Sequence, residues 1–304
     1  MPFPMIDRNA LLRRLEPPAG PVSMVLDTDT YNEIDDQFAV VYSLLSDKLT
    51  VEAIYAAPFF NSRSSGPGDG MQKSYEEIVR LLERMGRPVE NVYHGSTRYL
   101  ERVETPVHSE AVDDLIARAM QRRDGPLYVV AIGAITNVAS AILLRPEIAE
   151  RIVIVWLGGH PQYWPHTHEF NLGQDVLSAQ VVFDCGAAVV QIPCKNVAEH
   201  MRTTLPEMER YVRGRRAIGD YLYQIFQGYF DDHYARSKVL WDISTIAYLN
   251  NPDWVPTEVR SSPVLLDDVT WGPADPSRHP FRVAVDLDRD RIYGDLFRRL
   301  AARA

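Results

Sequence analysis

Five carboxylates fall within ten residues near the start of the sequence: Asp27, Asp29, Glu33, Asp35 and Asp36. They follow the apolar run 22–26, which predicts a strand, and precede the run 38–45, which predicts the inner face of a helix. Acids on such a loop lie where α/β folds bind their ligands. A helix dipole offsets less than about 1 kcal/mol per acid, so this crowding favours a bound cation. Oxygen-only ligands suit Ca²⁺ or Mg²⁺.

This acidic stretch fits three other structural roles less well. A solvated loop that caps a helix is the simplest, but the acids follow a buried strand rather than a polar run. An EF-hand counted from Asp27 requires Gly at its sixth position and Glu at its twelfth, where the sequence has Asn32 and Phe38. A phosphatase of the haloacid dehalogenase type also opens with Asp-x-Asp, but Tyr31 stands where that family has a small hydroxyl residue.

Polar side chains also follow other predicted strands and would border the same cleft. Asn61, after the strand 49–57, is either a turn former or a ligand. The loop 158–171, which follows the strand 151–157, is rich in aromatic and histidine side chains and is typical of a ligand wall. Its histidines, on a Pro-containing loop without matching cysteines, do not favour zinc. Asp242 opens a helix and on its own is an ordinary N-cap.

The elements that position these residues predict an α/β fold, with a mostly parallel central sheet flanked by helices and the site at the carboxyl ends of the strands. The remaining strands are predicted at 127–132 and 188–193. Helices are predicted at 7–15, 72–85 and 109–122, and another follows the turn 133–137 and ends at residue 144. Further helices are predicted at 176–184, with Asp175 as N-cap, and over much of 194–230. The tail 263–304 predicts two short strands and a charged helix, and residues 1–304 are expected to form a single domain.

Composition narrows the functional classes. The net charge of −9 argues against nucleic acid and anionic membrane as partners. No apolar run approaches the ~20 residues of a membrane span, and residues 1–14 contain no signal-peptide hydrophobic block. The two cysteines, Cys185 and Cys194, are far from a Cys-x-x-Cys arrangement. We therefore expect a reduced, cytoplasmic protein.

The strand ending in Asp-x-Asp, followed by an Asp-Asp pair that opens a helix, resembles the inosine-uridine preferring nucleoside hydrolase family. Three weaker pieces occur in that family's order, at 133–137, 169–171 and 241–242. The turn 30–34 is two residues longer than the Pro-Gly plus one residue that is usual there, which indicates a divergent branch. The resemblance covers roughly residues 20–250 and is most specific in the first fifty.

The resemblance implies calcium-dependent hydrolysis of the N-glycosidic bond of ribonucleosides, giving free base and ribose. It implies that a water on Ca²⁺ attacks, with Asp29 as general base. The implied metal ligands are Asp29, Asp36, Asp242 and the backbone carbonyl of Ile132. The implied substrate-binding residues are Asp35, Asn61, Glu169, Asn171 and Trp241, with Glu169 on the 5′ side of the ribose. A nucleoside is then the partner molecule, and a homodimer or homotetramer is the implied assembly.

Trp241 departs from the many family members that have a His before the final Asp as leaving-group acid. An indole N–H is no usable acid near neutral pH. Either Trp241 stacks on the base, as in some purine-preferring members, or it packs over the helix start. Two rival functions remain open: a non-catalytic protein that binds nucleosides or sugars, and a phosphatase with Asp27 or Asp29 as nucleophile.

Overall fold

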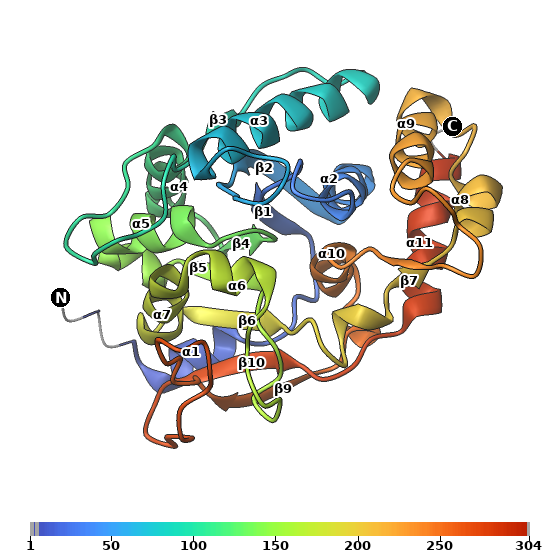
Figure 1. Cartoon of the computed structure of the whole chain (residues 1–304). Coiled ribbons are helices and arrows are strands. Elements are labelled where there is room, and N and C mark those ends of the chain that lie inside the picture. The colour runs from blue at the N-terminus through green and yellow to red at the C-terminus, as the bar shows by residue number, and fades with distance from the viewer. Residues whose placement is uncertain (1–2, 4–5, 303–304) are drawn as a thin grey trace.

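The apolar runs form an eight-stranded sheet with the strand order β3-β2-β1-β4-β5-β6-β10-β9 (Figure 1). The computed structural model describes residue 3 and residues 6–302. In spatial order the strands are β3 (Val92–His94), β2 (Leu49–Ala56), β1 (Val22–Thr28), β4 (Leu127–Ala131), β5 (Ile152–Leu157), β6 (Ala188–Ile192), β10 (Pro280–Ala284) and β9 (Thr257–Ser261). Neighbouring strands pair in parallel, except that β9 runs antiparallel to β10. The predicted, mostly parallel sheet is confirmed.

Helices cover both faces of the sheet because its strands are apolar on both sides. Met24 and Leu26 of β1 pack into one core, whereas Val25 between them packs into the other. The first core also holds side chains of α2 (Asp35–Leu45), α3 (Pro67–Arg84), α8 (Leu205–Tyr211), α9 (Arg216–Gln227), α10 (Ile243–Asn250) and α11 (Arg289–Ala302). The second holds side chains of α4 (Glu110–Met120), α5 (Thr136–Leu144) and α7 (Val176–Asp184). The remaining helices are α1 (Arg8–Arg14) and α6 (Phe170–Gln174).

Three helix starts follow from polar side chains at the N-cap. Asp7, Ser109 and Asp175 each accept a hydrogen bond from a backbone N–H in the first turn of α1, α4 and α7, respectively. Such caps satisfy N–H groups that have no partner within the helix. The predicted capping role of Asp175 is therefore confirmed.

The strand order places a topological switch beside β1. β2 and β3, which follow β1 in the sequence, lie on one side of it, whereas β4 pairs with the other side of β1. Where the order reverses, the loops after the two central strands separate and leave a crevice for ligands. The loop from β1 to α2 and the loop from β4 to α5 therefore open at one place in the fold.

The structure differs from the sequence-based expectations mainly at element ends. α3 begins at Pro67, five residues before the predicted start, because proline suits the first position of a helix. β9 lies at 257–261, ahead of the predicted tail 263–304. The sequence pattern does not predict β3, nor the antiparallel pair β7 (Arg202–Thr203) and β8 (Lys238–Val239), since these strands are only two or three residues long.

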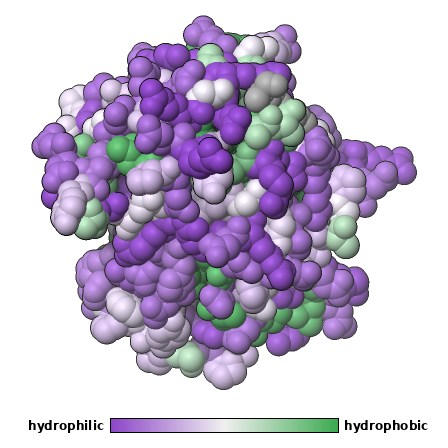
Figure 2. All heavy atoms as spheres, turned by 90° about the vertical axis from the view of Figure 1, so that its right-hand side faces the viewer, coloured by the Kyte–Doolittle hydropathy of each residue, from purple (hydrophilic) through white to green (hydrophobic). Residues whose placement is uncertain are grey.

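The surface contains no broad apolar band on the face that carries α8, α9 and α11. That face, at the right of Figure 1, is mainly hydrophilic in Figure 2, with hydrophobic side chains in small separate patches. Over the described residues, no helix combines the length and the apolar character that crossing a membrane requires.

Candidate active site

A cleft of about 590 Å³ opens at the topological switch. Its wall contains eight of the nine predicted site residues: Asp35, Asp36, Asn61, Ile132, Glu169, Asn171, Trp241 and Asp242. These residues come from five separate stretches of the chain and meet only in the folded protein. The ninth, Asp29, lies behind the wall rather than on it.

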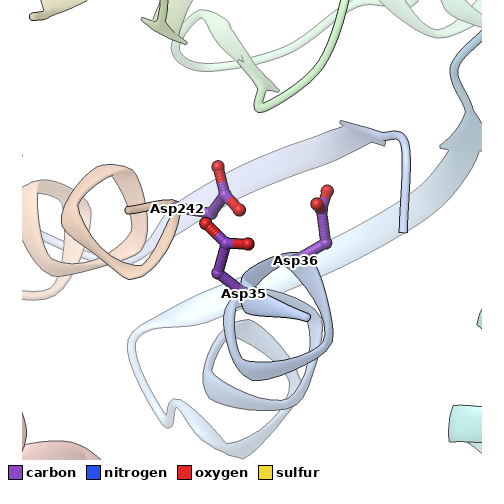
Figure 3. Close-up of side chains that lie close together, drawn as sticks. All are labelled: Asp35, Asp36 and Asp242. Carbon is purple, nitrogen blue, oxygen red and sulfur yellow. The ribbon is translucent and has the colours of Figure 1, made fainter. Parts of the chain in front are cut away.

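Three carboxylates meet at the base of the cleft. Asp35 and Asp36 stand in the first turn of α2, and Asp242 precedes α10 (Figure 3). Each offers an oxygen that lies within 4.8 Å of the others, and all three side chains are buried. Asp242 occupies the N-cap position but makes no capping hydrogen bond, so its carboxylate is available to the cleft. One oxygen of Asp36 accepts a hydrogen bond from the Thr28 hydroxyl at 2.5 Å.

Asp29 is a buried acid whose two oxygens have no hydrogen-bond partner. It follows the last residue of β1 and packs against Gly133, in the loop after β4. A Cβ on Gly133 would lie 2.9 Å from the Asp29 carboxyl carbon, so only glycine lets this backbone approach so closely. An unpaired charge in such a place is costly. The position therefore calls for a compensating group beyond the protein's own hydrogen-bond donors.

Burial and mutual repulsion raise the pKa of every acid in this group. Burial is the largest cause for Asp29, and the charges of Asp36 and Asp35 add to it. The same two causes raise the pKa of Asp36 to about 8 and also raise that of Asp242. Burial likewise raises the pKa of Asp35, although the ammonium of Lys238 opposes the shift. Four buried acids that resist ionising together are the arrangement expected of ligands that surround a cation.

The residue types fit a hard cation. The group offers carboxylate oxygens, and the backbone of Ile132 adds a carbonyl oxygen at the cleft wall. This carbonyl already accepts a hydrogen bond from the Asn171 amide at 3.1 Å, and its second lone pair is left for another partner. In the described part of the chain, the triple of Asp35, Asp36 and Asp242 is the one group of three or more His, Cys, Asp or Glu side chains close enough to hold a metal ion. The three loop histidines form no such group.

Beneath the cluster, Asp27 belongs to a separate hydrogen-bond network. One oxygen accepts from the Asn137 amide at 2.7 Å, and the Asn137 oxygen accepts in turn from the backbone and hydroxyl of Ser96. Burial raises the pKa of Asp27 to about 7, against the effect of the Asn137 bond. Asp27 thus links the end of β1 to α5 through a hydrogen bond next to the acidic loop.

Two predicted sugar ligands already serve the protein's own backbone. The Asn61 oxygen accepts from the N–H of Arg63, and its amide donates to Asn32 at 2.6 Å. Glu169 caps α6: its oxygens accept from the N–H groups of Gly159, Asn171 and Leu172. Both side chains nevertheless line the cleft. The Oε1 atom of Glu169 accepts one of these bonds and retains a lone pair, whereas its Oε2 atom accepts the other two. Their roles toward a sugar remain predictions.

Aromatic and histidine side chains form the upper part of the wall. Trp241 is partly buried against the core and faces the cleft, together with Tyr229 and Phe170. His160 and His168 also line it. His160 is buried, and its Nδ1 has no hydrogen-bond partner. The loop after β5 therefore forms part of the cleft wall, and its contact with a ligand stays a prediction.

Sequence reasoning missed the basic partner of this acidic site. Lys238 of β8 is buried and donates to Glu33 at 2.5 Å, and its ammonium lies 3.7 Å from an oxygen of Asp35. In the sequence, Glu33 is simply one of five clustered acids. The signal that was available is a lysine next to the apolar residues Val239 and Leu240 just before Asp242.

Comparisons with known proteins agree with this geometry. The family model described as inosine-uridine preferring nucleoside hydrolase matches residues 24–296. The pyrimidine-specific ribonucleoside hydrolase RihA of Klebsiella pneumoniae is 27% identical over 320 residues, which cover 91% of this chain and 98% of that protein. RihA of Salmonella paratyphi A is 27% identical over 270 residues, covering 78% and 82%.

Solved structures share the fold at lower identity. A purine-preferring ribonucleoside hydrolase from Gardnerella vaginalis superposes with a TM-score of 0.74 at 21% identity, over 92% of this chain and 98% of that one. A plant nucleoside hydrolase superposes with a TM-score of 0.72 at 23% identity, over 93% and 99%.

Proposed function

From its membership of the inosine-uridine preferring nucleoside hydrolase family, which makes the chain an N-ribosyl hydrolase, we propose the following reaction. The enzyme cleaves ribonucleosides to free base and ribose, the reaction depends on calcium, and Asp29 is the general base. The observation that carries the proposal is the buried Asp29 carboxylate. Neither of its oxygens is paired, and it stands beside the cluster of Asp35, Asp36 and Asp242.

Asp29, Asp36, Asp242 and the carbonyl of Ile132 would hold the proposed ion. When bound, calcium supplies positive charge that offsets the crowded acids, orients water and the ribose diol, and lowers the pKa of that water. The all-oxygen ligand set suits calcium and magnesium alike, and the choice of calcium rests on the family resemblance.

Asp29 accepts the proton of the attacking water while the water oxygen bonds to C1′ of the ribose. The bond between C1′ and the base nitrogen breaks at the same time, and its electron pair leaves with the base. Such transition states resemble an oxocarbenium ion, so charge placed near the ring matters. Burial and the neighbouring Asp36 raise the pKa of Asp29 when no cation is bound. A bound cation would lower this pKa again and keep Asp29 ionised, as a general base must be.

Asp35 and Asn171 are proposed to hold the ribose hydroxyls. Asp35 is at the cleft wall, and its position is fixed by the backbone N–H of Trp241, which donates to it at 3.1 Å. The Asn171 amide is anchored on the carbonyls of Ile132 and Leu157, which leaves its oxygen for a hydroxyl donor. Glu169 would hold the 5′ side of the ribose, and Asn61 would be a further ligand of the sugar.

Trp241 is proposed to stack on the departing base. A ring held against an aromatic face keeps its position while it gains a proton, and such stacking contributes about 1–3 kcal/mol per base. His160 and His168 line the same cleft, and we propose them as candidate donors of that proton. The relatives named above include pyrimidine-specific and purine-preferring enzymes, and the Trp241 proposal favours purines here.

The test is a screen of ribonucleosides for free-base release, run beside p-nitrophenyl riboside, whose leaving group needs no acid. Release of base and ribose from at least one nucleoside is the expected result. Activity on neither substrate class, with nucleoside binding retained, would identify a binding protein instead. Phosphate release from a generic ester without base release would identify a phosphatase.

A further inference from the structure

Lys238 occupies an unusual position for a basic side chain. In the part of the chain that the structure describes, it is the only lysine or arginine that is buried. It belongs to β8, just before the stretch that carries Trp241 and Asp242. Its ammonium donates to Glu33 at 2.5 Å and to the carbonyl of Val239 at 2.8 Å. A buried ammonium is retained only where such partners compensate for the lost water.

Glu33 fixes this ammonium from the acidic loop. One Glu33 oxygen accepts from Lys238, and the other accepts from the Tyr229 hydroxyl at 2.7 Å. The Lys238 ammonium also lies 5.1 Å from the centre of the Tyr229 ring. Arg63 donates to the backbone carbonyl of Glu33 at 3.2 Å, so main chain and side chain of this residue are both held. Glu33 lies in the turn 30–34, which makes the acidic loop longer than is usual for the family.

The fixed ammonium points at Asp35. It lies 3.7 Å from one carboxylate oxygen of Asp35, while the other oxygen accepts from the N–H of Trp241. The two groups that donate to or lie beside the Asp35 oxygens with positive charge thus come from the stretch 238–241. Two groups acting on the two oxygens set the orientation of the carboxylate plane, which neither would do alone.

A purely structural role for the Glu33–Lys238 pair is the competing possibility. A buried ion pair is on average no more stabilising than apolar residues of similar size. Glu33 is only partly buried, and its side chain retains 36% of its exposure. A pair that served stability alone would not need to place its ammonium against a second carboxylate in the cleft wall.

We propose that Lys238 is a positioning residue for catalysis: held by Glu33, it orients the Asp35 carboxylate toward the ribose hydroxyls. The inference rests on the proposed function, because it assigns Asp35 to the ribose. Lys238 itself is not part of the cleft wall, so it would act on the substrate only through Asp35. The longer acidic loop contributes to this arrangement, because its turn 30–34 contains Glu33, whose carboxylate binds Lys238.

The test compares four variants of the full-length, calcium-loaded protein. Lys238→Met removes the ammonium at similar length, Lys238→Arg retains a charge, and Glu33→Gln releases Lys238 with little change in size. Lys48→Met is the matched control, because the Lys48 ammonium also donates to two backbone carbonyls, those of Pro18 and Asn250, but lies outside the cleft. Each variant is assayed for kcat and KM on a ribonucleoside and on its 2′-deoxy analogue.

In Lys238→Met, kcat/KM on the ribonucleoside should fall on the order of 10²-fold, the size of effect that misplacing a reacting group produces. The 2′-deoxy analogue lacks one of the hydroxyls that Asp35 would bind. The fall in kcat/KM on this analogue should therefore be smaller, by a factor of at least about ten, than the fall on the ribonucleoside. Lys238→Arg should restore part of the preference for the ribonucleoside, and Glu33→Gln should shift the preference in the same direction as Lys238→Met. Lys48→Met should leave the preference unchanged.

A second readout is independent of turnover. Calorimetry on the calcium-loaded protein should show that Lys238→Met weakens ribose binding about tenfold, while calcium affinity stays within about threefold of wild type. Equal losses of ribose and calcium affinity, or an unchanged ribonucleoside preference in folded Lys238→Met, would overturn the inference. If Lys238→Met fails to fold, an unchanged preference in Glu33→Gln would do the same. A wild-type protein that hydrolyses no nucleoside would instead overturn the proposed function.

Discussion

Replacing Asp29 by Asn separates its chemical role from its structural one. The substitution keeps the shape of the side chain and removes its charge. Loss of a positioned general base costs roughly 10²- to 10⁴-fold in kcat. Because neither oxygen of Asp29 accepts a hydrogen bond, the amide breaks no existing bond. Removal of one charge from a buried group of like charges should raise the unfolding free energy of the metal-free protein by on the order of 1 kcal/mol.

The assay measures kcat by base release at saturating substrate and calcium, and unfolding by urea titration of chelator-treated protein. Asp114→Asn is the control, since the Asp114 carboxylate accepts from the Tyr55 hydroxyl at 2.7 Å and from Arg118 at 2.6 Å on the opposite face of the sheet. It should lose about 1–3 kcal/mol of stability with kcat unchanged. A near-normal kcat in Asp29→Asn would remove Asp29 from the mechanism, and a large loss of metal-free stability would make its role structural.

Three further predictions concern the metal and the cleft wall. Chelation should lower the melting temperature and added Ca²⁺ should restore it, because the ion binds the folded state only; identical melting curves would contradict the metal site. Trp241→Ala should reduce kcat on inosine by roughly 5- to 150-fold, corresponding to about 1–3 kcal/mol of stacking, and should barely affect p-nitrophenyl riboside; equal losses on both would make Trp241 structural. Asp35→Ala should lower kcat/KM on ribonucleosides by roughly 10- to 150-fold, with a smaller loss on 2′-deoxy substrates; equal losses would argue against a hydroxyl contact.

The local chemistry of the acidic loop could be read from the sequence because it depends on neighbours along the chain. The strand before Asp27 and the helix that begins at Asp35 are both close to where their apolar periodicity predicts them. The placement of Asp242 against Asp35 could be anticipated only through the family resemblance. Spacing in the sequence contains no information about that contact, which depends on how α10 packs against α2.

Other features of the site depend on contacts that no local pattern encodes. Asp29 packs closely against the loop after β4 because Gly133, more than a hundred residues away in the sequence, has no side chain. Lys238 pairs with Glu33 across 205 residues, and a single lysine beside two apolar residues gives little warning of a buried charge. By sequence, Asn61 is either a turn former or a sugar ligand, and Glu169 is a sugar ligand by resemblance. In the structure, the Asn61 side chain bonds to the backbone of Arg63 and to Asn32, and Glu169 bonds to backbone N–H groups.

Hydrolysis as a function of calcium tests the central claim most directly. Protein stripped of metal is titrated with calcium while ribose and free base are measured from inosine, and bound calcium is determined in the same samples. We predict no turnover without calcium and a rate that rises with bound calcium until one ion is bound per chain. In Asp242→Asn, the rate should reach saturation only at a much higher calcium concentration. Full activity in protein proven free of metal, or turnover that does not follow the bound ion, would contradict the assignment of this carboxylate cluster as the metal centre of the enzyme.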